Sequence, residues 1–515
     1  MPKWGLGSRV GLALVLVSLT SAAIAAVVAS TDPNTPYTFH YDNVLGTSLD
    51  LTVVAASEAS AHRAETAVLD QIDRDAKILS SYDAQSEFSR WFQTSGRAVP
   101  VSAELLEVLG LFDRWRDRTA GALDPAAEGI SRVWRSAAAA GRVPSDTEIA
   151  RAVRGARRLH WQLDPVARTA THLSSAPLVL NSFTKSYIVD RAARAALASG
   201  RVRAAVVNIG GDLVARGDWT ESVGIIDPLD RADNGRRVAQ LVVRNRAVAT
   251  SGGYRRGFDI GGRHYSHIVD PRTGQPTGHV LSATVISDDA VTAGALATAF
   301  CVLQPDEAAA LAARSPGSQY LLMLADGRRI ESTGWRPLVT PMADTIRVST
   351  PIATVHAAGQ TWNPAFELAI TIDLARPAGR AKRPYVAIWV EDANKVPVRT
   401  IALWFENPRW LPELRAWSRA DRRRATAPGR PGPSSISSAT RSPGQYTLKW
   451  DGKDQQGVPV KPGTYTVFIE AAREHGTYQL MQQTMDFADA PKRIDLTGNV
   501  EVAGVVLDYR KITDR

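Results

Sequence analysis

Hydrophobic positions in the first two thirds of the chain follow two different spacings. In residues 57–78 the apolar side chains recur on one helical face, and Ser102 is suited to cap a second helix that runs to Arg118. Shorter apolar runs predict strands at 204–209, 213–216, 222–226, 238–243 and 281–287. Helices mixed with such strands favour an α+β fold with antiparallel sheets and packed helices, which we place at residues 35–342.

The helical spacing disappears after about residue 342. Short alternating runs bounded by Gly or Pro predict strands at 365–374, 385–391, 399–404, 445–450 and 463–471. This pattern predicts a second domain, an all-β sandwich, over residues 350–515. Residues 419–443 are rich in Arg, Pro, Ser and Gly, and we interpret them as a disordered basic loop within that domain.

The chain opens with an export signal. Lys3 and Arg9 precede an apolar run from residue 10 to 29, and Ala23 and Ala25 provide a small-residue cleavage site. The run is also long enough to span a bilayer uncleaved, so residues 1–29 are either a signal peptide or a membrane anchor. Both alternatives predict an exported protein, periplasmic or attached to the outer face of the inner membrane.

Length, charge and cysteine content narrow the function classes. A chain of 515 residues exceeds one ordinary core, and its formal net charge of +9 favours anionic partners. We find no motif that reads nucleic acid, so a nucleotide or a membrane surface fits the charge better. The one cysteine, Cys301, lies in an apolar run and is predicted to be a buried small hydrophobe without a disulfide.

Two segments carry side chains suited to chemistry. Asn208-Ile209-Gly210-Gly211-Asp212 lies between two predicted strands, where paired glycines let the backbone approach a ligand and Asp212 adds a carboxylate. Further on, His267 and Asp270 precede a Pro-Arg-Thr-Gly turn. A histidine of near-neutral pKa can take a proton from a hydroxyl, so His267 and Asp270 are the candidates for a general base. Taken alone, the same segments also fit a hairpin and an ordinary Asp-Pro turn.

Together these segments resemble the ApbE family, the FAD:protein FMN transferases. Leu45-Gly46-Thr47, Gly121-Ala122-Leu123-Asp124-Pro125 and Thr298 at the end of an Ala-rich run match further elements of the family, in the family's order. The resemblance extends from about residue 41 to 334. It implies an enzyme that moves FMN from FAD to a threonine hydroxyl of a target protein and releases AMP.

The resemblance also implies site residues. His267 and Asp270 would be catalytic, and the residues that would contact FAD are Leu45, Tyr82, Ala122, Leu123, Asp124, Lys185, Asn208, Gly210, Gly211, Asp212 and His267. Taken alone, Tyr82 equally fits a half-buried aromatic residue at a helix end, and Lys185 fits a solvated lysine at a helix start.

The expected divalent cation, Mg²⁺, is where the sequence departs from the family. The carbonyl of Ser182 and the hydroxyl of Thr298 would be metal ligands, but Gly294 stands where the family has an aspartate. Val179 likewise replaces an aspartate, and Ser186 replaces a glycine. Magnesium prefers hard oxygen ligands that include a carboxylate, so this substitution should weaken the metal site.

The C-terminal domain resembles a periplasmic domain of unknown function found in exported proteins associated with flavin. It contains Ser437-Ser438-Ala439-Thr440, which is similar to the target segments of the family, so Thr440 is a candidate flavin acceptor. A Ser/Thr-rich turn is the other interpretation. The sequence therefore leaves two main hypotheses: an exported transferase whose partners are FAD and a target flavoprotein, or an FAD- or FMN-binding protein without transfer activity that serves periplasmic electron transfer. A plain structural export module is a third.

Overall fold

The fold is seen in a computed structural model of the chain. It describes residues 35–230, 232–254, 256–340, 361–376, 383–405, 408–425, 437–438, 440–473, 476–488 and 490–512. The expected signal or anchor, residues 1–29, lies outside these ranges. None of the helices within them has the length and hydropathy needed to cross a membrane.

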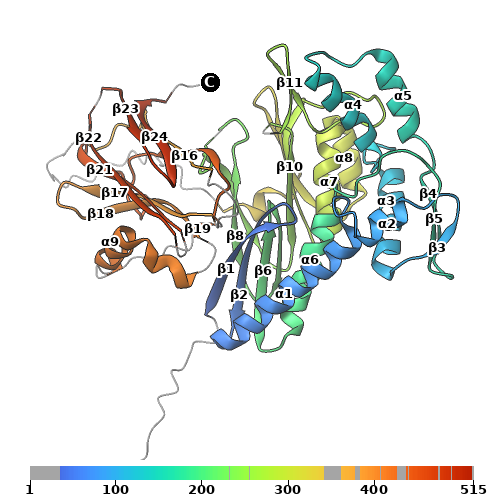
Figure 1. The fold of residues 1–515 in the computed structure, drawn as a ribbon, viewed down its shortest axis with the longest axis horizontal. Coiled ribbons are helices and arrows are strands. Elements are labelled where there is room, and N and C mark those ends of the chain that lie inside the picture. Colours follow the sequence, from blue (N-terminus) through green and yellow to red (C-terminus); the bar gives the residue numbers. More distant parts are fainter. Residues whose placement is uncertain are drawn as a thin grey trace, which may run out of the picture.

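A large antiparallel sheet organises the first domain (Figure 1). Its strands, in spatial order, are β1 (Pro36–Val44), β2 (Thr47–Ala55), β6 (Val202–Ile209), β7 (Asp212–Gly217), β10 (Ala247–Gly252), β13 (Val280–Ser287), β14 (Gln319–Leu324) and β15 (Arg329–Glu331). The strands predicted at 204–209, 213–216 and 281–287 are confirmed as β6, β7 and β13.

Helices cover one face of this sheet. They are α1 (Glu58–Leu79), α6 (Thr184–Ala198), α7 (Ala290–Val302) and α8 (Pro305–Ala313). The predicted first helix is confirmed as α1, which begins where the Ser57 side chain accepts a hydrogen bond from the backbone of Ser60. Helix α7 is buried almost throughout, because it packs against both the sheet and α6.

A two-stranded hairpin covers the opposite face of the sheet. It consists of β8 (Glu221–Ile226) and β9 (Arg237–Val243), which confirm the strands predicted at 222–226 and 238–243, and it is accompanied by the short helix η1 (Arg336–Leu338). Apolar residues of β6, β7, β9 and β14 form the core beneath it, together with Trp335. The sheet is thus buried on both faces.

A second lobe stands beside the helices (Figure 1). Its elements are α2 (Glu87–Phe92), β3 (Ala98–Pro100), α3 (Ala103–Arg118), α4 (Ala127–Ala139), α5 (Asp146–Ala156), β4 (Trp161–Asp164), β5 (Thr169–His172), β11 (Gly257–Ile260) and β12 (Arg263–Ser266). Helix α3 confirms the second predicted helix, with the Ser102 side chain accepting from the backbone of Leu105.

The C-terminal domain packs two antiparallel sheets face to face, so the predicted α+β domain followed by a β-sandwich is confirmed. One sheet contains β20 (Gly444–Trp450), β16 (Phe366–Leu374), β24 (Val502–Lys511) and β23 (Lys492–Thr497). The other contains β19 (Ser437–Ser438), β18 (Pro397–Trp404), β17 (Tyr385–Asp392), β21 (Gly463–Ala472) and β22 (Tyr478–Phe487), and only its short β18–β19 pair is parallel within the described residues.

The expectation of a loop from residue 419 was wrong at its start. Helices η2 (Pro408–Glu413) and α9 (Arg415–Ala425) cover the outer face of the β17 sheet. Trp417 and Ala420 lie one helical turn apart and are buried there, and the Glu470 carboxylate accepts hydrogen bonds from the backbone of Ala416 and Trp417. These apolar contacts order a segment whose composition is dominated by arginine. Residues 426–436 and 439 of the expected loop lie outside the described residues.

The two domains touch through the loop between β8 and β9. The backbone nitrogen of Asp233 donates to the carbonyl of Thr447 at 2.8 Å, and the Asn234 amide exchanges two hydrogen bonds with the backbone of Lys449. The Lys449 ammonium also lies 3.1 Å from the Asp230 carboxylate. This loop therefore lies along β20, which is the edge strand of its sheet.

Candidate functional site

Lys185 and Asp212 bring helix α6 and the β6–β7 hairpin together. Lys185 lies in the first turn of α6, and its Nζ donates to the Gly210 carbonyl at 3.3 Å and lies 3.6 Å from Oδ2 of Asp212. The Ser186 hydroxyl donates to the same carboxylate oxygen at 3.2 Å. Burial raises the pKa of Asp212, while Lys185 and Ser186 act in the opposite direction. The corner thus presents a fixed ammonium beside a hairpin backbone.

The paired glycines at the hairpin tip are required by its geometry. Gly210 and Gly211 have φ of +55° and +96°, a region that disfavours other residues. A Cβ on Gly210 would also meet the Thr47 side chain at 2.6 Å. The close approach brings the predicted Leu45-Gly46-Thr47 segment to the hairpin, and Asn208 holds the turn by accepting a hydrogen bond from the Gly211 nitrogen at 3.2 Å.

The two predicted metal ligands contact each other directly. The Thr298 hydroxyl on α7 donates to the Ser182 carbonyl at 3.1 Å and lies 3.3 Å from the Ser251 hydroxyl on β10. These contacts place the end of β10 beside the segment that precedes α6. Cys301, one turn further along α7, is buried as predicted, and burial raises the pKa of its thiol to about 12. It therefore serves packing at neutral pH.

Tyr82 is strongly exposed rather than half-buried at the helix end. Its residue is 78% exposed, yet its hydroxyl accepts a hydrogen bond from the Asn181 side chain. The backbone nitrogen of Leu180 donates to the neighbouring Ser81 at 3.0 Å. An aromatic face held in solvent next to the Ser182 segment is available to stack on a planar ligand.

The Ala122-Leu123-Asp124 segment is buried. The Asp124 carboxylate accepts a hydrogen bond from the backbone nitrogen of Ala126 at 2.7 Å and forms an ion pair with the Arg116 guanidinium at 2.8 Å. Burial, the largest influence, raises the pKa of Asp124 to about 6. Asp124 nevertheless lines a cavity of about 340 Å³, together with Arg272 and neighbouring residues. The Gly121–Pro125 segment and the Pro-Arg turn that follows Asp270 therefore meet at one cavity.

His267 presents one ring nitrogen for chemistry. Its Nδ1 lies 3.1 Å from the Arg256 carbonyl, which can only accept, so Nδ1 carries the proton and Nε2 keeps a lone pair. The residue is exposed. Partial burial of the ring is the main influence that lowers the pKa of His267, and the positive charge of Arg256 adds to it. The ring is thus held neutral and oriented, as a general base requires.

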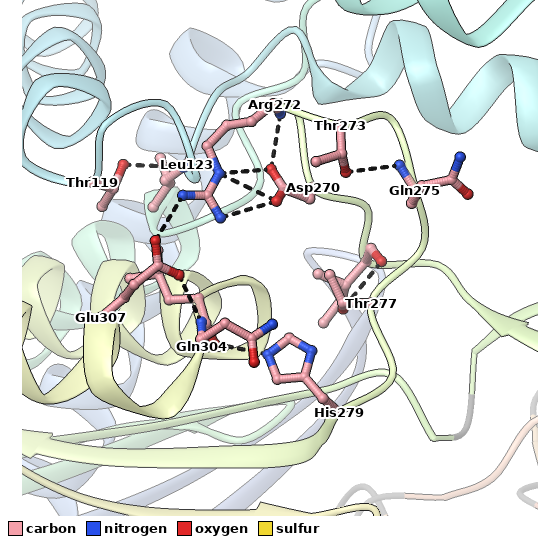
Figure 2. Close-up of polar contacts among 12 residues, drawn as sticks. Thr119, Leu123, Asp270, Arg272, Thr273, Gln275, Thr277, His279, Gln304 and Glu307 are labelled. Carbon is pink, nitrogen blue, oxygen red and sulfur yellow. Dashed lines mark hydrogen bonds and ion pairs between the residues drawn. The ribbon is translucent and has the colours of Figure 1, made fainter. Parts of the chain in front are cut away.

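The Asp270 carboxylate is held by the Arg272 side chain (Figure 2). Arg272 covers both of its carboxylate oxygens at 3.0–3.2 Å, donates its backbone nitrogen at 2.8 Å, and reaches on to Glu307. Among the contacts of the described residues, none joins Asp270 to His267. Because Arg272 engages both carboxylate oxygens, the geometry favours Asp270 as the residue that shapes the turn.

The similarity of the chain to known proteins decides its family. Residues 45–322, more than half of the chain, match the model described as "ApbE family". The chain belongs to the ApbE family. Residues 367–504 match "Predicted periplasmic protein (DUF2271)", which agrees with the fusion predicted from sequence.

Curated ApbE relatives and solved structures agree with this assignment. An FAD:protein FMN transferase of Rhodobacter capsulatus is 31% identical over 63% of this chain, although the match spans only 62% of that protein. One from Klebsiella pneumoniae (strain 342) is 27% identical over 66% of this chain and 96% of the relative. The ApbE protein structure from Thermotoga maritima has a TM-score of 0.53 at 27% identity and covers 59% of this chain and 99% of that one. The apo flavinyl transferase ApbE of Pseudomonas stutzeri gives 0.50 at 25%, covering 59% and 96%.

The residues at the expected magnesium position of this ApbE domain do not fit that ion. The oxygens there, the Ser182 carbonyl and the Thr298 hydroxyl, are neutral and bond to each other. A Cβ on Gly294 would lie 2.3 Å from the Ser186 hydroxyl, so the position has no room for a carboxylate. In the described part of the chain, no group of three or more His, Cys, Asp or Glu side chains is arranged to hold a metal.

Thr440 is buried, with 3% of its surface exposed. It follows β19, which pairs with β18. In this conformation the hydroxyl is not presented to a ligand in the first domain, so the geometry argues against Thr440 as an accessible acceptor.

Sequence reasoning missed two hydroxyls and a guanidinium that organise the site. Ser186 donates a hydrogen bond to Asp212, the Ser251 hydroxyl contacts that of Thr298, and Arg272 holds Asp270. A signal existed for Ser186, which stood out as a replacement of a family glycine. Ser251 has no signal in the sequence, because its role depends on where β10 ends.

Proposed function

We propose that this protein is an exported FAD:protein FMN transferase. A threonine hydroxyl of a target protein attacks the FMN phosphorus of FAD, forming an O–P bond. The P–O bond to the AMP phosphate breaks, AMP leaves, and the hydroxyl proton passes to Nε2 of His267. Neither oxidation nor reduction is involved, so the reaction balances with FAD and the hydroxyl alone.

One observation carries the proposal. Segments that lie 25 to 116 residues apart along the chain meet at a single place, where Lys185 contacts Gly210 and Asp212, and Thr298 contacts Ser182. An ammonium, a glycine-rich backbone and the partly buried hydroxyls of Ser182 and Thr298 suit a diphosphate, because the ammonium offsets its negative charge and the other groups can form hydrogen bonds with it. The exposed ring of Tyr82 suits the flavin.

His267 supports the chemical step. The Arg256 carbonyl fixes its tautomer, and its lowered pKa keeps the ring neutral, so Nε2 can accept the proton of an incoming hydroxyl. Asp270 contributes by holding the turn that follows His267, through its contacts with Arg272. Leu45 and the Ala122–Asp124 backbone complete the proposed FAD contacts.

The acceptor is proposed to be a threonine on a separate flavoprotein outside the cytoplasm. The C-terminal match to a predicted periplasmic family and the apolar N-terminal run support export. Thr440 is an alternative acceptor only if its buried segment opens.

Mass spectrometry tests the proposal. Purified protein is incubated with FAD and a threonine-containing acceptor domain, and the acceptor should gain the mass of FMN less one water while AMP appears in equal amount. The His267→Ala variant should give neither product while still binding FAD. Flavin that stays as intact FAD on the wild-type protein, with no adduct on any acceptor, would contradict the proposal.

A second function is favoured by Gly294. If loss of the carboxylate at this position has removed catalysis, the protein binds FAD or FMN without transfer and serves periplasmic electron transfer. The same experiment distinguishes the two, because a binder retains stoichiometric flavin and releases no AMP.

A further inference from the structure

Where α6 packs against α7, the Ser186 side chain fills the space that a side chain at position 294 would need. Both residues are buried, and a Cβ built on Gly294 would lie 2.3 Å from Ser186 Oγ and 3.3 Å from the Phe183 backbone. Contacts below 3.0 Å require one partner to move. Any side chain at position 294 therefore needs a smaller residue at 186, so the two positions form a matched pair.

The Ser186 hydroxyl also occupies one of the carboxylate oxygens of Asp212. It donates to Asp212 Oδ2 at 3.2 Å, on the same oxygen that lies 3.6 Å from Lys185 Nζ. The Asp212 side chain is only 15% exposed, so its charge is balanced within the protein by Lys185 rather than by solvent. A carboxylate committed to an ammonium and a hydroxyl is a weak ligand for a further cation.

The remaining oxygens nearby are uncharged. Thr298 donates to the Ser182 carbonyl at 3.1 Å and lies 3.3 Å from the Ser251 hydroxyl. Magnesium sheds its water reluctantly and is held in proteins chiefly by carboxylates and phosphates. The Ser182 carbonyl and the Thr298 hydroxyl are neutral and already hydrogen-bonded to each other, so they are weak replacements for the water ligands of Mg²⁺.

Lys185 can supply the positive charge instead. An ammonium has three N–H donors, and the Gly210 carbonyl and Asp212 account for two. Its side chain is 30% exposed at the start of α6, where the helix N-terminus adds partial positive charge. A phosphate oxygen can therefore reach it from solvent.

We infer that this protein binds the diphosphate of its flavin nucleotide through Lys185 without a protein-held divalent cation, and that Ser186 is the positioning residue that makes this arrangement. The identity of the ligand rests on the proposed function. The absence of a protein-held cation concerns the residues themselves, and it can be tested without any transfer activity.

The first test compares FAD affinity with and without Mg²⁺, by flavin fluorescence titration of the full chain. Wild-type affinity should change by less than about threefold between EDTA and millimolar Mg²⁺, a difference below 1 kcal/mol. The exchanged variant Ser186→Gly/Gly294→Asp should gain about tenfold or more in affinity when Mg²⁺ is added. A wild-type affinity that falls tenfold in EDTA and returns with Mg²⁺ overturns the inference.

The second test uses the metal alone and does not depend on flavin binding. Mn²⁺ is titrated into each protein and free Mn²⁺ is followed by electron paramagnetic resonance. The wild type should leave Mn²⁺ free in the submillimolar range, and the exchanged variant should bind it, with the site lost on adding Thr298→Val. Tight wild-type binding that Thr298→Val abolishes overturns the inference, even if no flavin binds at all.

Single variants keep these tests interpretable. Gly294→Asp alone should lower the melting temperature because of the clash with Ser186, and the added Ser186→Gly should restore much of it. If Gly294→Asp is tolerated without loss of stability and gains no metal response, the two positions are not a matched pair.

Discussion

Nζ of Lys185 lies 3.6 Å from Oδ2 of Asp212, across the gap between the start of α6 and the β6–β7 hairpin. The pair joins two segments that are separate in sequence and fixes a positive charge beside the glycine turn. Because both residues are only partly exposed, loss of either one leaves a charge with less compensation.

Lys185→Met should weaken FAD binding by about tenfold or more, since a phosphate loses its ammonium partner. Flavin fluorescence titration measures this. Lys77→Met is the matched control, because Lys77 is exposed in the last turn of α1. Equal losses in the two variants would show that general positive charge, and not this position, sets the affinity.

His267→Ala should slow FMN transfer by about 10²–10⁴-fold and leave FAD affinity within a few fold, because a general base acts on the chemical step. AMP release measures the rate. His264→Ala, three residues away on β12, removes an exposed histidine that pairs with Asp259 and should have little effect.

The pH profile of transfer should reflect the lowered pKa of His267. Neutral imidazole is the active form, so the rate falls as acid protonates it. Because the pKa lies below the ordinary value of 6.5, the fall should begin at a lower pH than for an unperturbed histidine. A profile whose acid limb lies well above pH 6.5 would contradict this assignment.

Asp270→Asn separates a turn residue from a general base. Asparagine keeps an oxygen that can accept from the backbone nitrogen of Arg272, so the turn should survive and the rate should fall by less than about tenfold. A loss as large as that of His267→Ala, with an unchanged melting temperature, would make Asp270 the base instead.

Gly210→Ala should lower the free energy of unfolding by about 1–3 kcal/mol, because the added methyl group meets Thr47. Chemical denaturation measures the change. Gly211→Ala is the control: its Cβ would meet nothing within 4 Å, so it adds only the backbone strain of a positive φ. Equal effects would mean that the contact with Thr47 is not limiting.

Thr440 should remain unmodified when the intact protein is incubated with FAD alone, because the residue is buried. Peptide mass spectrometry after proteolysis checks this. An FMN adduct at Thr440, absent in Thr440→Val, would show that the segment opens and that the protein modifies itself.

Much of the fold could be predicted from local patterns. Helix α1 follows from periodicity because it buries one face, and strand β16 follows from its apolar run because it is buried on both faces over most of its length. Helix α9 could not be predicted, since its arginines dominate the composition while only a few apolar residues meet the sheet.

Site residues that belong to sequence motifs could be predicted, whereas contacts that depend on how the chain packs could not. Lys185 and Asp212 were found through matched segments, and the structure brings them together. The separation of Asp270 from His267 depends on how Arg272 folds back over its own turn, which spacing does not encode.

The loop between β8 and β9 has a consequence for solubility. By bonding to Thr447 and Lys449, it occupies the open side of β20, which would otherwise offer unpaired backbone groups to a strand of another molecule. The first domain thus covers the edge strand of the second and prevents it from pairing with other molecules. A C-terminal domain produced by itself should therefore self-associate unless β20 is protected in another way.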